Sequence, residues 1–279
     1  MKLIALFGMA SLATFAVAQD KAETTDHSGH ENQSCCAAPK EATRASYLEL
    51  KTPLPAEAVK GAVTGKVVFD GKAPKMDPLT IKKEAAEGCT DDGEVDPTDR
   101  SLLVDKDGGI ANAVVTVVVK GAEVKVPEEA IKMDQVACRY EPHVILIPAG
   151  STVNYLNSDK VSHNVHTYAG RNDSLNKTIA PGSSESQTLK KEDKIEVKCD
   201  IHPWMNAYMF VTEDPYTTVT GADGSFSLEG VPAGEHKVEI WHEKLGKQKG
   251  KVTVKEDGTA EALTIKMGES KKGGGRRRR

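Results

Sequence analysis

The stretch that most constrains the fold runs from Ile195 to Met205 and reads IEVKCDIHPWM. Its opening residues alternate apolar and polar side chains, which predicts a β-strand that runs into a tight loop. The loop carries Cys199, His202 and Met205 at the spacing C-x-x-H-x-x-M. A partner segment lies upstream, over residues 157–167 (NSDKVSHNVHT). A thiolate, two imidazoles and a weak thioether are the ligands of a mononuclear copper site for electron transfer, so we expect the two segments to meet around one copper ion.

The upstream segment offers two histidines, His163 and His166. With Cys199 and His202 they could also form a tetrahedral zinc site. Residues three apart on an extended strand point to opposite faces, however, so the two histidines cannot easily converge on one ion. The fourth position then falls to Met205. We assign His163, at the start of its strand, as the ligand, and His166 is the alternative.

Length and charge limit the number of domains and the kinds of partner that the chain can have. The chain has 279 residues, of which 38% are apolar and 28% charged, enough for one large or two modest domains. Lys and Arg total 37 and Asp and Glu total 41, and the net charge of -4 gives no indication of nucleic-acid binding. After the N-terminal stretch, no segment approaches the length and apolarity of a membrane span.

The N-terminus has the pattern of a secretory signal. Residues 1–18 contain one Lys, an apolar run and Ala-Val-Ala, which predicts cleavage after Ala18 and export to the periplasm or the cell surface. Disulfides persist in such compartments. If Cys199 holds the metal, Cys89 and Cys138 are the natural disulfide pair, and closing that loop would contribute about 4 kcal/mol.

Residues 19–60 are polar and lack periodicity, which predicts a disordered tether. Within it lie His27, His30, Cys35 and Cys36, whose side chains could capture a copper or zinc ion. An unstructured linker that happens to contain them is the favoured interpretation.

The rest of the chain predicts an all-β fold. Residues 61–124 contain two strand patterns, GAVTGKVVFDGK and ANAVVTVVV, and residues 216–267 contain four short strands separated by glycine turns, the spacing of a β-sandwich. Between them we expect one helical turn near residues 126–133, a hairpin over residues 143–156 and a long polar loop over residues 171–187. We expect residues 268–279 to form a basic, flexible tail.

SHNVH followed by CDIHPWM resembles the cupredoxins, the blue type 1 copper proteins, and the short ligand loop is most similar to that of amicyanin, with plastocyanin more distant. The resemblance implies a Greek-key β-sandwich over residues 125–215. It implies that the copper ligands are His163, Cys199, His202 and Met205, which matches the assignment made from spacing. It also implies that Asn164 hydrogen bonds to the Cys199 sulfur and links the two ligand loops, where Asp200 replaces a small hydroxyl residue.

The flanking segments resemble a second family, the carboxypeptidase regulatory or transthyretin-like sandwich. GAVTGKVVFDGKAP with ANAVVTVVV is similar to its first half, and GADGSFSLEGVPAGEHKVEIWHE is similar to its second. We therefore expect the copper module to be inserted in one such sandwich. Two independent β units in series are the alternative.

The resulting hypothesis is an exported protein that carries single electrons between unidentified redox partners. Pro203 and Trp204, beside His202, would form a weakly apolar docking patch of the small kind that transient redox encounters use. Copper storage or delivery, with the tether as an acquisition arm, is a second hypothesis. A cell-surface interaction module with a subsidiary copper site is a third. The further His-rich motifs of copper enzymes are missing from the sequence, so we do not expect an enzyme.

Overall fold

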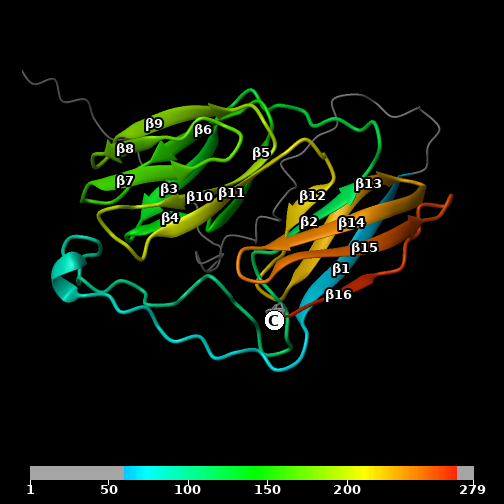
Figure 1. The fold of residues 1–279 in the computed structure, drawn as a ribbon, viewed down its shortest axis with the longest axis horizontal. Helices are drawn as coiled ribbons and strands as arrows, with labels where there is room; N and C mark the ends of the chain where they lie inside the picture. The colour runs from blue at the N-terminus through cyan, green and yellow to red at the C-terminus, as the bar shows by residue number, and fades with distance from the viewer. Residues whose placement is uncertain (1–59, 269–279) are drawn as a thin grey trace, which may run out of the picture. The chain divides into compact units, whose positions relative to one another are not determined.

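Residues 60–268 are described in the computed structural model of the chain, and strands dominate this range (Figure 1). It contains sixteen strands and one 3-10 helix, η1 (Lys83–Ala85), so the predicted all-β class is confirmed. The predicted signal peptide, nearly all of the tether with its histidines and cysteines, and the basic tail lie outside the described residues. Within residues 60–268, no helix has the length and apolarity needed to cross a membrane.

The part that carries the predicted copper ligands folds into two facing sheets. One has the strand order β5-β11-β10-β7-β8 and the other β4-β3-β6-β9. Most neighbouring strands in these sheets are antiparallel, but β5 pairs with β11 in parallel, and so does β3 with β6. Parallel neighbours need a crossover connection, so the chain crosses between the sheets. The strands are β3 (Ile131–Val136), β4 (Arg139–Glu141), β5 (Val144–Pro148), β6 (Ser151–Leu156), β7 (His163–Tyr168), β8 (Asn176–Ile179), β9 (Ser184–Leu189), β10 (Asp193–Lys198) and β11 (Asn206–Thr212).

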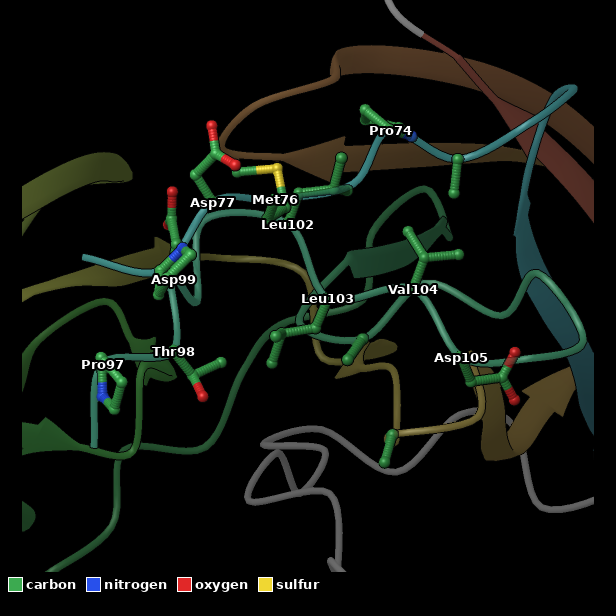
Figure 2. Close-up of a pocket in the computed structure, with 14 residues that line it drawn as sticks. Pro74, Met76, Asp77, Pro97, Thr98, Asp99, Leu102, Leu103, Val104 and Asp105 are labelled. Carbon is green, nitrogen blue, oxygen red and sulfur yellow. The ribbon is translucent and has the colours of Figure 1, made fainter.

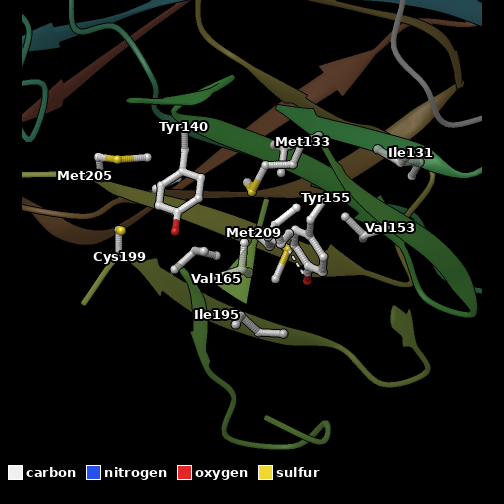
Figure 3. Packing of buried hydrophobic residues seen from close by; sticks show 14 of the residues in the cluster. Ile131, Met133, Tyr140, Val153, Tyr155, Val165, Ile195, Cys199, Met205 and Met209 are labelled. Atoms are coloured by element: carbon white, nitrogen blue, oxygen red, sulfur yellow. Dashed lines mark hydrogen bonds between the residues drawn. The ribbon is translucent and has the colours of Figure 1, made fainter. Parts of the chain in front are cut away.

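Alternating side chains fill the space between these two sheets. Along β3, Ile131 and Met133 point inward and are buried, whereas Lys132 and Asp134 are more exposed. They join Tyr155, Ile195 and Met209 in one packed cluster (Figure 3). Each wholly buried side chain of this size contributes about 2 kcal/mol. The core therefore fixes the register of β7 and β10, the strands that lead to the predicted ligands.

A second pair of sheets combines strands from both ends of the described range. One sheet has the order β13-β1-β16 and the other β12-β2-β14-β15. Their apolar faces form a separate cluster, centred on residues such as Val67, Val115 and Ile240. The strands are β1 (Lys60–Phe69), β2 (Val114–Val118), β12 (Thr217–Val219), β13 (Ser225–Pro232), β14 (Gly234–His242), β15 (Gly246–Val254) and β16 (Leu263–Met267).

Strands that precede and follow the copper-ligand segment thus share the same sheets. β1 pairs with β13 and β16, and β2 pairs with β12 and β14. This pairing is what an insertion of one sandwich into another produces, and we propose that organisation for the chain. The domain boundaries and the transthyretin-like identity of the outer sandwich stay predictions.

Four local expectations were wrong. Residues 126–133 lead into strand β3 rather than a helical turn, and residues 171–187 contain β8 and most of β9, whose mainly polar residues lack the apolar alternation that marks a strand. Residues 143–156 do not form a hairpin, because β5 and β6 lie in different sheets. At this crossing Ala149 donates its N–H to Thr212, and Gly150, with a φ of 96°, donates to Leu189. Residues 216–267 hold five strands rather than four.

The pairing of the two flanks predicts a sensitive position at Gly109. A Cβ atom there would collide with the backbone of Asp223, next to the hydrogen bond from Val67 to the Gly224 carbonyl. Since a backbone atom cannot rotate away, we expect Gly109→Ala to lower the free energy of unfolding by about 2–3 kcal/mol in urea titrations. The control Gly250→Ala, whose Cβ would lie 3.8 Å from Val238, should change it by less than about 1 kcal/mol. Equal effects would contradict this packing.

Candidate metal centre

The register of β7 and β10 brings the two predicted ligand segments together. These strands are antiparallel neighbours, with Lys198 opposite His166 and Val197 opposite Thr167. The start of β7 therefore lies beside the end of β10. His163 is the first residue of β7, and Cys199 follows β10 directly.

The loop after β10 is closed by its own backbone. Met205 donates its N–H to the His202 carbonyl at 2.9 Å, and Cys199 donates to the Met205 carbonyl at 3.2 Å. The loop then returns as β11, whose Asn206 pairs with Lys198. This closure holds Cys199, His202 and Met205 at the same end of the sheet.

The metal-binding atoms of three residues converge there. His163 Nδ1 lies 3.0 Å from His202 Nδ1, and Cys199 Sγ lies 3.8 Å from the same nitrogen. Ligand atoms of His163, Cys199 and His202 all lie within 4.8 Å of one another, and the three side chains are buried. Two imidazole nitrogens and a soft sulfur in a site closed to water are a donor set that fits copper.

Met205 is also buried, with 1% of its surface exposed. Figure 3 shows Cys199 and Met205 at the same end of the packed core as Tyr140. The fourth predicted ligand therefore packs in the same buried core as Cys199, where its side chain is shielded from solvent.

His166 takes no part in this cluster. Its Nδ1 lies 3.1 Å from the Asp200 carboxylate, and its ring stacks on Tyr168 with 4.3 Å between ring centroids. The alternation along β7 turns His163 inward and His166 outward, as expected for an extended strand. The zinc set of two histidines from this strand is therefore not assembled.

Asn164 ties the two ligand segments together. Its backbone N–H points at Cys199 Sγ at 3.4 Å, and its side-chain oxygen accepts the backbone N–H of Asp200 at 3.0 Å. Its own carbonyl accepts the hydroxyl of buried Tyr140 at 2.6 Å. The link between the loops therefore uses the backbone of Asp200, while the Asp200 carboxylate turns to His166.

Sequence reasoning missed Asp159. Its carboxylate lies 2.7 Å from His163 Nε2 and accepts the backbone N–H groups of Ala137 and Cys138 at 2.6 and 2.8 Å. Ala137 and Cys138 have positive φ values of 51° and 53°, so the carboxylate satisfies a tight turn between β3 and β4 while orienting His163. The one available signal was an acidic residue four positions before the histidine.

Burial sets the charge of the two histidines. Desolvation, strengthened by the neighbouring His163, lowers the pKa of His202 to about 4. Desolvation also lowers the pKa of His163, against the opposing effect of Asp159. Both imidazoles are therefore neutral near pH 7, the form that binds a metal ion.

The cysteine pair and the predicted docking residues lie beside the cluster. Cys89 and Cys138 form a disulfide with 5.2 Å between their Cα atoms. Trp204 is half-buried and donates its indole N–H to the Cys138 carbonyl at 3.1 Å, whereas Pro203 is exposed. His202 is 5% exposed, so little of its ring reaches solvent.

The remaining histidines of the described range and a surface hollow are not part of the proposed metal centre. His143 is buried against Glu243, His236 lies 2.8 Å from the Pro232 carbonyl, and buried His242 accepts the Lys244 N–H. A hollow of about 450 Å³ is lined by residues of segments 73–78 and 97–105 with Ala111 and Ala222 (Figure 2). None of the predicted ligands lines it.

Comparisons with known proteins agree with this chemistry. Residues 127–212 match the sequence model of the copper-binding proteins of the plastocyanin/azurin family. This segment is therefore similar to the copper-binding cupredoxins, and the match supports copper as its cofactor. No curated protein matches the chain.

Three solved structures are similar to parts of the chain. The nitrite reductase NirK from Thermus scotoductus SA-01 is 23% identical over 35% of this chain and 25% of its own, with a TM-score of 0.30. The chain thus spans a quarter of that enzyme. A purple cupredoxin from Nitrosopumilus maritimus (22% identity, 29% and 99% coverage, TM-score 0.26) and a reduced variant of amicyanin (25% identity, 35% and 98% coverage, TM-score 0.29) are also similar.

The lowered pKa of His202 predicts a pH dependence for the metal-free protein. Unfolding raises this pKa from about 4 to about 6.5, so the unfolded chain binds more protons between these values. Stability should therefore fall as the pH drops from about 6.5 to about 4. His202→Asn removes the group, so the melting temperature of this variant should depend less on pH than that of the parent. Parallel curves for the two proteins would contradict the assignment.

Proposed function

We propose that the protein is an exported type 1 copper protein that carries single electrons between redox partners. The supporting observation is the buried convergence of His163, Cys199 and His202 within a segment that matches a copper-binding family. Met205 would complete the proposed ligand set as a weak thioether donor. Copper supplies the chemistry, by exchanging one electron between its two oxidation states.

The protein's contribution is to hold the ligands still. Asp159 orients His163 through Nε2, which leaves Nδ1 free to bind. The N–H of Asn164 and that of His202, each 3.4 Å from Cys199 Sγ, stabilise a thiolate. Because these contacts hold the ligand side chains in place, little has to rearrange when the charge on copper changes, which favours rapid electron transfer.

Export and docking belong to the same proposal. The disulfide between Cys89 and Cys138 supports an oxidising compartment. Pro203 and the 49% exposed Ile201 flank His202 and offer apolar surface for a brief encounter with a partner. Trp204, half-buried and hydrogen bonded to Cys138, would serve chiefly to brace the loop.

The visible spectrum of the copper-loaded protein tests this function. Charge transfer from a thiolate to copper(II) gives strong visible absorption, so the oxidised mature chain should be intensely coloured and should bleach on one-electron reduction. Cys199→Ser and His163→Ala should lose the colour. His166→Ala, altered on the outward face of the same strand, is the matched control and should keep it. A colourless parent protein, or equal loss in the two histidine variants, would refute the proposal.

The contact between Asp159 and His163 gives a quantitative prediction. Replacing a carboxylate that orients a metal-binding histidine typically costs 10–100-fold in metal affinity. We expect Asp159→Asn to weaken copper(II) binding by about that factor in competition titrations. Asp91→Asn, which removes an exposed ion pair with Lys160, is the control and should leave the affinity unchanged. An unaltered affinity in Asp159→Asn would show that the carboxylate serves only the turn.

A further inference from the structure

The disulfide lies against the metal centre rather than at a distance from it. Cys138 Sγ is 3.9 Å from His163 Nε2, the nitrogen opposite the one that faces His202. Ligand atoms of Cys89, Cys138 and His202 lie within 4.8 Å of one another, as do those of Cys138, Asp159 and His163. Two further sulfur atoms therefore lie immediately outside the proposed first site.

The two cysteines come from elements of different rigidity. Cys138 lies in the tight turn between β3 and β4, where Asp159 accepts its N–H. Cys89 belongs to a segment that precedes residues 127–212 and contains only η1 as regular structure between β1 and β2. Near Cys89 this segment contacts the copper-binding half through the buried side chains of Ala86 and Cys89, through Gly88 against Val161 and through the exposed Asp91–Lys160 pair. No strand of the described range pairs with this segment near Cys89, so side-chain packing and the disulfide are what keep Cys89 in place.

We propose that Cys89 and Cys138, once reduced to thiols, form a second metal site that binds copper(I). In the reduction step the S–S bond breaks and each sulfur gains one electron and one proton. A dithiol supplies both as it is oxidised to its own disulfide; alternatively a phosphine supplies the electrons and water supplies the protons, and the water oxygen ends in the phosphine oxide. Copper(I) then displaces the two thiol protons and binds both thiolates. This site does not use Cys199, so it is independent of the proposed electron-carrier site.

The surroundings select copper(I) over zinc. Soft thiolates favour copper(I), which is stable with two sulfur ligands, whereas structural zinc needs four protein ligands. The nearby imidazoles of His163 and His202 direct their Nδ1 atoms toward the first site. The carboxylate of Asp159 is already engaged by two backbone N–H groups and His163. Two thiolates are therefore the ligands that remain.

The test measures copper(I) stoichiometry in the full chain before and after reduction. Cys35 and Cys36 could also bind copper(I), so the parent protein carries Cys35→Ser and Cys36→Ser. Its disulfide is left intact or reduced with a phosphine, and bound copper(I) is then counted by competition with a chromogenic copper(I) chelator. We expect one copper(I) per chain with the disulfide intact and two after reduction. Adding Cys199→Ser should leave the gain of one copper unchanged, even if the electron-carrier proposal fails.

Alkylation followed by mass spectrometry shows which cysteines bind the second copper(I). In the reduced protein, copper(I) should protect both Cys89 and Cys138 from iodoacetamide, and Cys89→Ser should abolish both the gain and the protection of Cys138. An unchanged stoichiometry after reduction would overturn the proposal. So would an extra copper(I) that leaves both cysteines open to alkylation, or a reduced chain that unfolds and retains no second copper.

Discussion

The antiparallel pairing of β7 with β10 is the constraint on which the metal centre depends. It places the start of one strand beside the end of the other, and so it brings His163 to Cys199 across 36 residues of sequence. The packed core beneath these strands fixes their register, because a slip by one residue would turn His163 outward and His166 inward. The position of the proposed ligands is thus decided by the packing of an apolar core that includes Cys199 and Met205.

The site is assembled at a cost in stability. Two imidazoles and a thiol are held within a few ångströms of one another and away from water, and burial of unpaired polar groups is unfavourable. Hydrogen bonds offset part of this cost: Asp159 bonds to His163, and Asn164 bridges the two loops. Desolvation keeps both histidines neutral, while these contacts orient His163 and hold the two ligand loops together.

Much of this could be predicted from sequence because the informative residues lie close together. The spacing of Cys199, His202 and Met205 defines the loop, and strand alternation distinguishes His163 from His166. Asp159 could not be predicted, since its role depends on a turn formed by a different strand pair. The strands β8 and β9 were missed because their mainly polar residues give no apolar alternation. The crossing at Ala149 and Gly150 depends on hydrogen bonds to Thr212 and Leu189, which local patterns do not reveal.

The claim that most needs a direct test is that one copper ion lies between His163 Nδ1, His202 Nδ1 and Cys199 Sγ. Anomalous diffraction at the copper absorption edge, from crystals of the copper-loaded protein with its disulfide intact, locates the ion without assumptions about its ligands. We predict a single strong peak within bonding distance of those three atoms, with Met205 facing it. A peak centred elsewhere, or none at this position in a fully loaded protein, would contradict the account.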